Sequence, residues 1–170
     1  MKDVNIQYFV EGEDEKKLLS TLKNQLGVVR PGKVQRLNVV QSRMPMNVLR
    51  TLKKGTVVVL VFDTDTNNTD ILNDNIRLLN GYAFISKVIT VPQVRNLEDE
   101  LVRSCDIRNI TELLNSRSKK DFKSDLIRIT NLDSKLKEKK FDIEQFWSKQ
   151  PEPPYQHIAN EASLIKMHTK

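Results

Sequence analysis

Acidic residues follow two apolar segments of the sequence, at the points where those segments end. Glu11 comes directly after IQYFV (6–10), and Asp63 and Asp65 come directly after TVVVLVF (56–62). If both segments are neighbouring parallel strands, their carboxyl ends share the edge of the sheet where open α/β folds place their chemistry. Residues two apart in an extended chain point to the same side, so both aspartates should reach one site. The sequence therefore predicts that three carboxylates converge.

Converging carboxylates repel one another and raise each other's pKa unless a cation lies among them. Oxygen ligands without His or Cys favour Mg²⁺ or Mn²⁺ over zinc. His157 and His168 lie near the C-terminus, where we expect exposed side chains, and the single cysteine, Cys105, is expected to be a small buried hydrophobic residue. A simpler interpretation stays open, in which Asp63 and Asp65 only stabilise a turn and the acids from Glu11 onward only stabilise the start of a helix.

The elements that must position these residues alternate along the first half of the chain. Apolar segments predict strands at 4–10, 34–40, 56–62 and 82–91, and helical spacing of apolar residues predicts helices at 16–26, 46–52 and 69–80. The segment 56–62 is apolar on both faces, which is typical of the middle of a parallel sheet covered by helices on both sides. We therefore expect an α/β fold with a mostly parallel central sheet of about four strands, flanked by helices.

The pattern changes after Pro92. Asn96 is expected to cap a helix that reaches Cys105, and two further helical segments are predicted at 107–114 and around 122–129. This divides the chain into an α/β metal-binding core (1–95), a helical extension packed on the core as a C-terminal cap (96–150) and a loosely held, proline-containing tail (151–170). Phe146 and Trp147 are expected to anchor the cap through burial rather than to form a binding surface.

Composition and charge limit the function further. The chain has 170 residues, 38% of them hydrophobic, which suits one folded unit with its own core. No segment is typical of a signal peptide or long enough to span a membrane, so we expect a cytoplasmic protein without a membrane partner. The net charge is +6, with ten Lys or Arg and no acid in 16–62 and nine Lys or Arg against four acids in 117–140. Basic regions around an acidic one favour a polyanionic partner, although scattered basic residues are also typical of a solvated surface.

The segments FVEGEDEKKLL and VVVLVFDTDTN together resemble the Toprim domain, the metal-binding unit of topoisomerases, bacterial primases, recombination proteins and several nucleases. Its signature is a strand ending in Glu-Gly followed by a strand ending in Asp-x-Asp, and the resemblance covers residues 4–91. Glu15, four positions after the first Glu, is more similar to the overcoming-lysogenization-defect (OLD) nucleases than to primases. The segment RNLEDELVRSC and the basic helical segment after it resemble the small stand-alone RloB-type proteins of phage defence and restriction loci.

This resemblance implies a Toprim-like fold and assigns roles to particular residues. The catalytic metal ligands it implies are Glu11, Asp63 and Asp65. Glu15 would support a second Mg²⁺ or Mn²⁺ ion, and Glu98 is a further candidate ligand, although acids at 98–100 also suit the first turn of a helix. A nucleic-acid-binding role falls on Lys119, Lys120 and Lys123, one of which could stabilise charge on the scissile phosphate.

Chemistry narrows the reaction that such a site would perform. A topoisomerase needs a tyrosine nucleophile in a separate domain, and we expect no such domain beside Tyr8, Tyr82 or Tyr155. A primase needs template- and nucleotide-binding machinery, for which the sequence has no recognisable segment. Hydrolysis of DNA or RNA by a metal-dependent nuclease remains, with nucleic acid as partner and with a possible second partner, such as an ATPase encoded elsewhere. Two alternatives stay open. One is a non-catalytic Toprim-like module that binds nucleic acid or a protein, and the other is a haloacid dehalogenase-like phosphatase with Asp63 as nucleophile.

Overall fold

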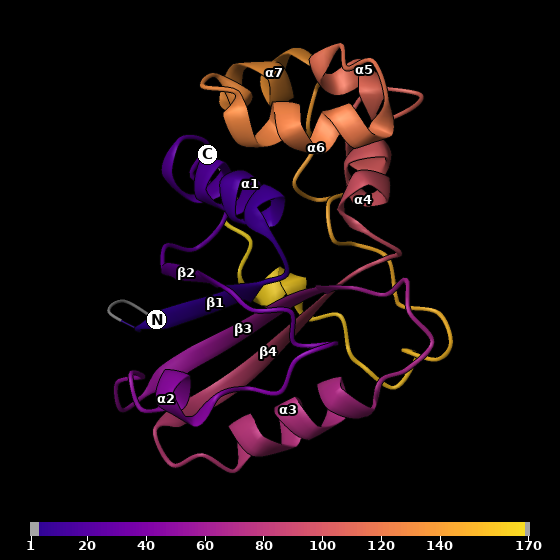
Figure 1. The fold of residues 1–170 in the computed structure, drawn as a ribbon. Coiled ribbons are helices and arrows are strands. Elements are labelled where there is room, and N and C mark those ends of the chain that lie inside the picture. The colour runs from indigo at the N-terminus through magenta and orange to yellow at the C-terminus, as the bar shows by residue number, and fades with distance from the viewer. Residues whose placement is uncertain (1–3, 169–170) are drawn as a thin grey trace.

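A parallel sheet forms the centre of the fold in the computed structural model, which describes residues 4–168 (Figure 1). Within that part of the chain the sheet has four strands: β1 (Ile6–Val10), β2 (Lys33–Arg36), β3 (Thr56–Asp63) and β4 (Ile85–Gln93). Their order is β2-β1-β3-β4, and every neighbouring pair is parallel. The predicted α/β fold with a central sheet of about four parallel strands is therefore confirmed.

Both faces of β3 are buried, as its sequence predicts. Val57, Val59 and Val61 belong to one hydrophobic cluster, which includes the apolar side chains of α1 (Glu13–Asn24) and α4 (Leu97–Ser104). Val58, Leu60 and Phe62 belong to a second cluster, which includes those of α2 (Met46–Leu49) and α3 (Asp70–Asn80). Side chains alternate between the faces of a strand, so one apolar strand supplies both cores. Helices cover the two faces of the sheet as a result (Figure 1).

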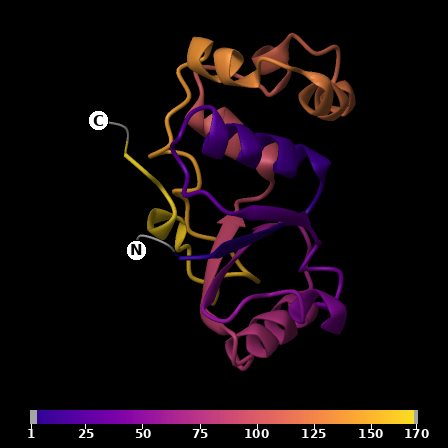
Figure 2. The same ribbon diagram turned by 90° about the vertical axis from the view of Figure 1, so that its left-hand side faces the viewer.

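Three short helices follow α4 and continue the first cluster. They are α5 (Thr111–Leu114), α6 (Lys119–Arg128) and α7 (Leu132–Glu138). Figure 2 shows them as a layer on the far side of α1 from the sheet. Phe122 and Leu126 of α6 and Leu132 and Leu136 of α7 are buried in the same cluster as the apolar residues of α1. The expected helical cap is present: α4 packs directly against the sheet, whereas α6 and α7 pack against α1.

Element boundaries differ from the predicted ones where side chains compete with regular structure. β2 ends at Arg36 rather than at residue 40, because the Asn38 side-chain oxygen accepts the N–H groups of Val40 (3.1 Å) and Gln41 (3.2 Å) and closes a turn. β4 continues through Pro92 to Gln93, two residues beyond its predicted end, since β4 is an edge strand and tolerates a proline. α1 begins three residues earlier than predicted, and only Thr111–Leu114 of the predicted helix at 107–114 is helical.

The prediction of a loosely held tail is wrong for residues 151–168, here called the C-terminal segment. Tyr155 and Ile165 are both 0% exposed, in the second and first clusters respectively. The segment includes a short 3₁₀ helix, η1 (Ala162–Leu164), and Lys166 forms an isolated antiparallel bridge with Val29. Apolar side chains among the prolines therefore fix the segment to the core.

Several smaller expectations hold. His157 and His168 are exposed, and Phe146 and Trp147 are buried against each other with ring centroids 4.5 Å apart. Cys105 departs from its expectation, since it is partly buried rather than fully buried. Among residues 4–168, no helix combines the length and the apolar character needed to cross a bilayer.

Candidate metal centre

Three carboxylates meet at the carboxyl edge of the sheet. β1 and β3 are parallel neighbours, with Phe9 opposite Leu60, so the residues that follow each strand lie together. Glu11, Glu15 and Asp63 each offer a carboxylate oxygen, and these oxygens all lie within 4.8 Å of one another. We call these three residues the acidic triad. The two acidic strand ends therefore meet as the sequence predicts.

The third member of the acidic triad comes from the first turn of α1. Glu13 points outward and pairs with Arg36 at 3.4 Å, whereas Asp14 and Glu15 are buried. A Cβ atom on Gly12 would lie 2.9 Å from Asp14 Oδ1 and 3.1 Å from Glu15 Oε2. The glycine between strand and helix thus leaves room for these carboxylates to approach the strand end. Negative charge at this helix end is also favourable, because backbone N–H groups point toward it.

Hydrogen bonds orient the other two members. Asn38 Nδ2 donates to Glu11 Oε1 at 3.0 Å, and the Asp63 backbone N–H donates to Glu11 Oε2 at 3.3 Å. Gln93 Nε2 donates to Asp63 Oδ1 at 2.7 Å, from the position directly opposite Asp63 in the register of β3 and β4. Hydrogen bonds within the protein therefore hold the Glu11 and Asp63 carboxylates in place, and these bonds do not depend on a cation.

Glu15 differs from its neighbours because one of its oxygens has no partner. The residue is 6% exposed, and Oε2 is inaccessible to solvent without any hydrogen-bond donor among the described residues. Nearly all buried polar atoms in proteins are hydrogen-bonded, and a buried carboxylate oxygen left alone is costly. Either a proton shared with the neighbouring Asp14 or a divalent cation would satisfy this oxygen, and an all-carboxylate donor set suits Mg²⁺ or Mn²⁺. The residues present therefore fit such an ion.

Burial and mutual repulsion shift the titration of the acidic triad. Burial raises the pKa of Asp63 to about 9, with the charge of Glu11 adding to the effect and the Gln93 hydrogen bond opposing it. Burial likewise raises the pKa of Glu15 to about 10, helped by Asp14. The pKa of Glu11 is also raised, chiefly by burial, against the opposing effect of the Asp63 backbone N–H. Without a cation, the acidic triad therefore retains protons at neutral pH.

Asp65 and Glu98 lie near the acidic triad but outside it. β3 ends at Asp63, and the Thr64 backbone N–H donates to the Arg95 carbonyl at 2.8 Å, so the extended alternation that would align Asp65 with Asp63 stops there. The charges of both residues still raise the pKa of Asp63. Their role as ligands stays a prediction.

A cleft of about 450 Å³ opens beside the acidic triad, and it contains all three of the predicted phosphate-binding lysines. Its lining residues are Asp63, Asp65, Asn96, Glu98, Asp99, Lys119, Lys120 and Lys123. The lysines stand in the first turns of α6, where the Ser118 side chain accepts the Asp121 N–H at 3.1 Å and caps the helix. The cleft therefore brings positive side chains to the same opening as the carboxylates.

Lys123 faces these carboxylates most directly. Its Nζ lies 3.8 Å from Glu98 Oε1. Burial alone would lower the pKa of Lys123, but the nearby carboxyl groups together outweigh burial and raise it; these are Glu98, Asp14, Glu15 and Asp63. Lys123 therefore stays protonated at the mouth of the site.

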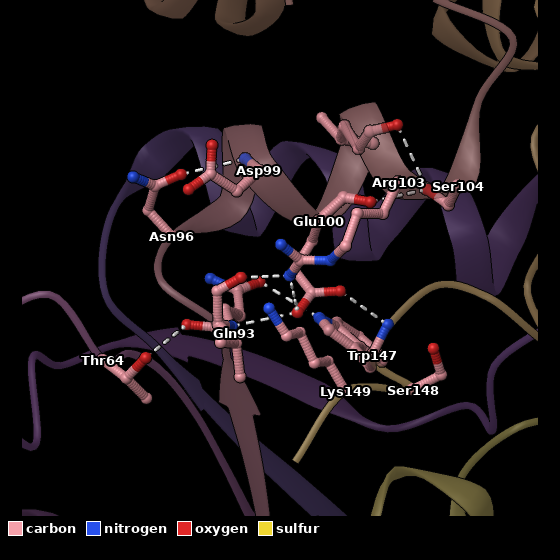
Figure 3. Close-up of polar contacts among 12 residues, drawn as sticks. Thr64, Gln93, Asn96, Asp99, Glu100, Arg103, Ser104, Trp147, Ser148 and Lys149 are labelled. Carbon is pink, nitrogen blue, oxygen red and sulfur yellow. Dashed lines mark hydrogen bonds and ion pairs between the residues drawn. The ribbon is translucent and has the colours of Figure 1, made fainter. Parts of the chain in front are cut away.

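Sequence reasoning missed four residues around the acidic triad: Asp14, Asn38, Gln93 and Trp147. Gln93 meets the criterion used for Glu11 and Asp63, a polar residue at the carboxyl end of an apolar strand, but the predicted strand ended at residue 91. Asn38 was placed inside a predicted strand. Trp147 Nε1 donates to Gln93 Oε1 at 3.1 Å from a position far along the chain, and nothing local in the sequence indicates that contact (Figure 3).

Comparison of the chain with protein-family models, with curated proteins and with solved structures found no match.

Proposed function

We propose that this protein is a Mg²⁺- or Mn²⁺-dependent nuclease that hydrolyses phosphodiester bonds in DNA or RNA. The observation that carries the proposal is the acidic triad, in which the buried Glu15 Oε2 has no hydrogen-bond partner within residues 4–168, next to a cleft that contains three lysines. The carboxylates supply a cation site, and the lysines supply a surface for a phosphate backbone.

Each residue has a distinct task in this proposal. Glu11, Glu15 and Asp63 would hold the ion, and Asp65 and Glu98 are the nearby candidates for a second one. A bound Mg²⁺ or Mn²⁺ ion would polarise the phosphodiester and promote deprotonation of the attacking water. Asn38, through its bond to Glu11, fixes the direction in which that carboxylate faces.

The lysines of the cleft would position the substrate. Lys119 and Lys120 are exposed and free to follow a phosphate backbone, whereas Lys123 remains charged beside the carboxylates. A protonated lysine at this place would offset negative charge that develops on the phosphate during hydrolysis.

The proposal agrees with the resemblance of the β1 and β3 motifs to Toprim domains of the OLD and RloB type. A role in phage defence, and a partner such as an ATPase encoded elsewhere, belong to the proposal through that resemblance alone.

The test is cleavage of single- and double-stranded DNA and RNA with Mn²⁺, with Mg²⁺ and with EDTA. We expect metal-dependent cleavage by the wild type and a loss of about 100-fold or more in Asp63→Asn, because a ligand is removed. The matched control is Asp70→Asn, an exposed residue at the start of α3, which should cleave as the wild type does. Circular dichroism would establish that both variants keep the fold.

Other results would redirect the proposal. Mn²⁺ uptake without cleavage of any polymer would favour a non-catalytic binding module. Phosphate release from small phosphomonoesters, but not from polymers, would favour the phosphatase with Asp63 as nucleophile. Absence of metal uptake by the wild type would contradict the nuclease and its site together.

A further inference from the structure

We propose that Gln93 is a positioning residue for Asp63 and that Trp147 sets the orientation of the Gln93 amide. This inference rests on the proposed metal centre and extends it to residues that do not themselves carry a ligand. It depends on a series of hydrogen-bonded residues that begins in α4 and ends at the last residue of β3. The members, in order, are Glu100, Trp147, Gln93 and Asp63.

The Gln93 side chain lies between a hydrogen-bond acceptor, Asp63 Oδ1, and a hydrogen-bond donor, Trp147 Nε1. It is 1% exposed, its Nε2 donates to Asp63 Oδ1 at 2.7 Å, and its Oε1 accepts from Trp147 Nε1 at 3.1 Å. An indole N–H can only donate, so it requires the amide oxygen on its side. The amide NH₂ must then face Asp63. A flipped amide would place its NH₂ against the indole N–H, which is a repulsive contact between two donors. It would also place its oxygen against Asp63 Oδ1, which is repulsive when Asp63 is ionised, as it would be beside a cation.

Trp147 is itself held in place by side chains on both sides of its backbone. Its N–H donates to Glu100 Oε2 at 2.9 Å, and its carbonyl accepts from Asn160 Nδ2 at 2.9 Å. Its φ of 55° lies in the left-handed region, which is unfavourable for a bulky residue unless the surroundings impose it. These contacts hold the backbone from which the indole reaches Gln93.

Glu100 completes the series from α4 (Figure 3). Its side chain is 0% exposed, and its other oxygen accepts from the Val94 backbone N–H at 2.9 Å and from Arg103 Nη2 at 2.7 Å. A buried carboxylate with this many partners is a rigid anchor. The position of Asp63 Oδ1 is therefore linked, through Gln93 and Trp147, to a charge buried in α4.

The consequence is a ligand that is ordered before an ion arrives. Partners that orient a metal ligand typically change metal affinity about 10- to 100-fold when removed. A purely structural role of Trp147 would act through burial instead, and its neighbour Phe146, 0% exposed in the same cluster, would then behave alike.

The experiment is a calorimetric titration with Mn²⁺ of the wild type, Trp147→Phe, Gln93→Met and the double variant. We expect each single variant to weaken Mn²⁺ binding about 10-fold, and the double variant to bind no more weakly than Gln93→Met, because Trp147 acts through Gln93. Phe146→Leu is the matched control, which should lower Tm and leave the Kd for Mn²⁺ within about twofold. Equal losses of affinity in Trp147→Phe and Phe146→Leu, or additive losses in the double variant, would overturn the proposal.

A second measurement needs no metal. Trp147 is the single tryptophan of the chain, so its indole N–H gives one identifiable peak in a ¹H–¹⁵N spectrum. Asp63→Asn should shift that peak in the wild-type background and leave it in place in Gln93→Met. A peak that moves equally in both backgrounds would contradict the series of contacts, whereas a wild type that takes up no Mn²⁺ would contradict the proposed function.

Discussion

At the scale of single residues, Glu15 and Asp63 combine burial with like charge. Burial raises the pKa of Glu15 from 4.5 to about 10 and the pKa of Asp63 from 3.8 to about 9. The folded state therefore binds these protons more tightly than the unfolded state. The stability that the protons contribute is complete below the unfolded pKa values and is lost as pH rises through the folded ones. A cation would replace the protons and remove this dependence.

We accordingly expect Tm in EDTA to fall as the pH rises from about 5 to about 9, and to fall much less with Mg²⁺ or Mn²⁺ present. Glu15→Gln keeps the shape of the side chain without its charge. It should flatten the slope in EDTA and raise the free energy of unfolding near pH 8 by about 1–3 kcal/mol. Thermal melts followed by circular dichroism would measure both effects. A Tm in EDTA that increases over this range would contradict the assignment.

At the scale of elements, the carboxyl edge of the sheet and the start of α6 share one opening. The sheet and α1 position the acidic triad, whereas α6 positions Lys119, Lys120 and Lys123 in the neighbouring cleft. The two sets come from different elements, so the proposed nucleic-acid binding and the proposed metal binding should be separable by mutation.

Replacement of Lys119 and Lys120 by Ala should weaken nucleic-acid binding alike for all sequences and reduce the slope of log K against log salt by about 1 per lysine. The affinity for Mn²⁺ should not change. Fluorescence anisotropy in EDTA at several salt concentrations would measure the slope. Lys53→Ala and Lys54→Ala are matched controls, because these exposed lysines precede β3 at the opposite edge of the sheet. Equal effects in both pairs would show that binding follows net charge rather than the cleft.

At the scale of the whole molecule, the C-terminal segment closes both hydrophobic clusters over the sheet. Tyr155 stacks on Phe62 with ring centroids 6.3 Å apart, and its hydroxyl forms a 2.7 Å hydrogen bond with Thr66, in the loop that carries Asp65. The Thr90 backbone and side chain bond to residues 159–161 along the outer edge of β4. The segment is therefore part of the fold, and it also supports the loop beside the acidic triad.

Tyr155→Ala should lower the free energy of unfolding by about 3–5 kcal/mol, because it removes a fully buried ring. Tyr155→Phe removes only the hydroxyl and should cost about 1 kcal/mol. Urea denaturation would measure both variants. A loss below about 1 kcal/mol for the alanine variant would be inconsistent with the packing of this segment.

The sequence alone determined the features that follow from local pattern. The apolar residues on both faces of 56–62 predicted the central strand. Asn96 was a predicted helix cap, and its side chain accepts the Asp99 N–H at 2.9 Å at the start of α4. The acids that follow two strands predicted where carboxylates meet. These features depend on residues close together in the chain, whose periodicity and capping chemistry can be read directly.

Tertiary structure decided which carboxylates share the site and what holds them. Glu15 rather than Asp65 completes the acidic triad, because α1 begins at Glu13 and β3 ends at Asp63. Gln93 meets Asp63 because β4 runs beside β3. Trp147, whose backbone is left-handed, reaches Gln93 from a position 54 residues further along the chain. Such contacts join residues distant in sequence through packing and register, and no local pattern encodes them.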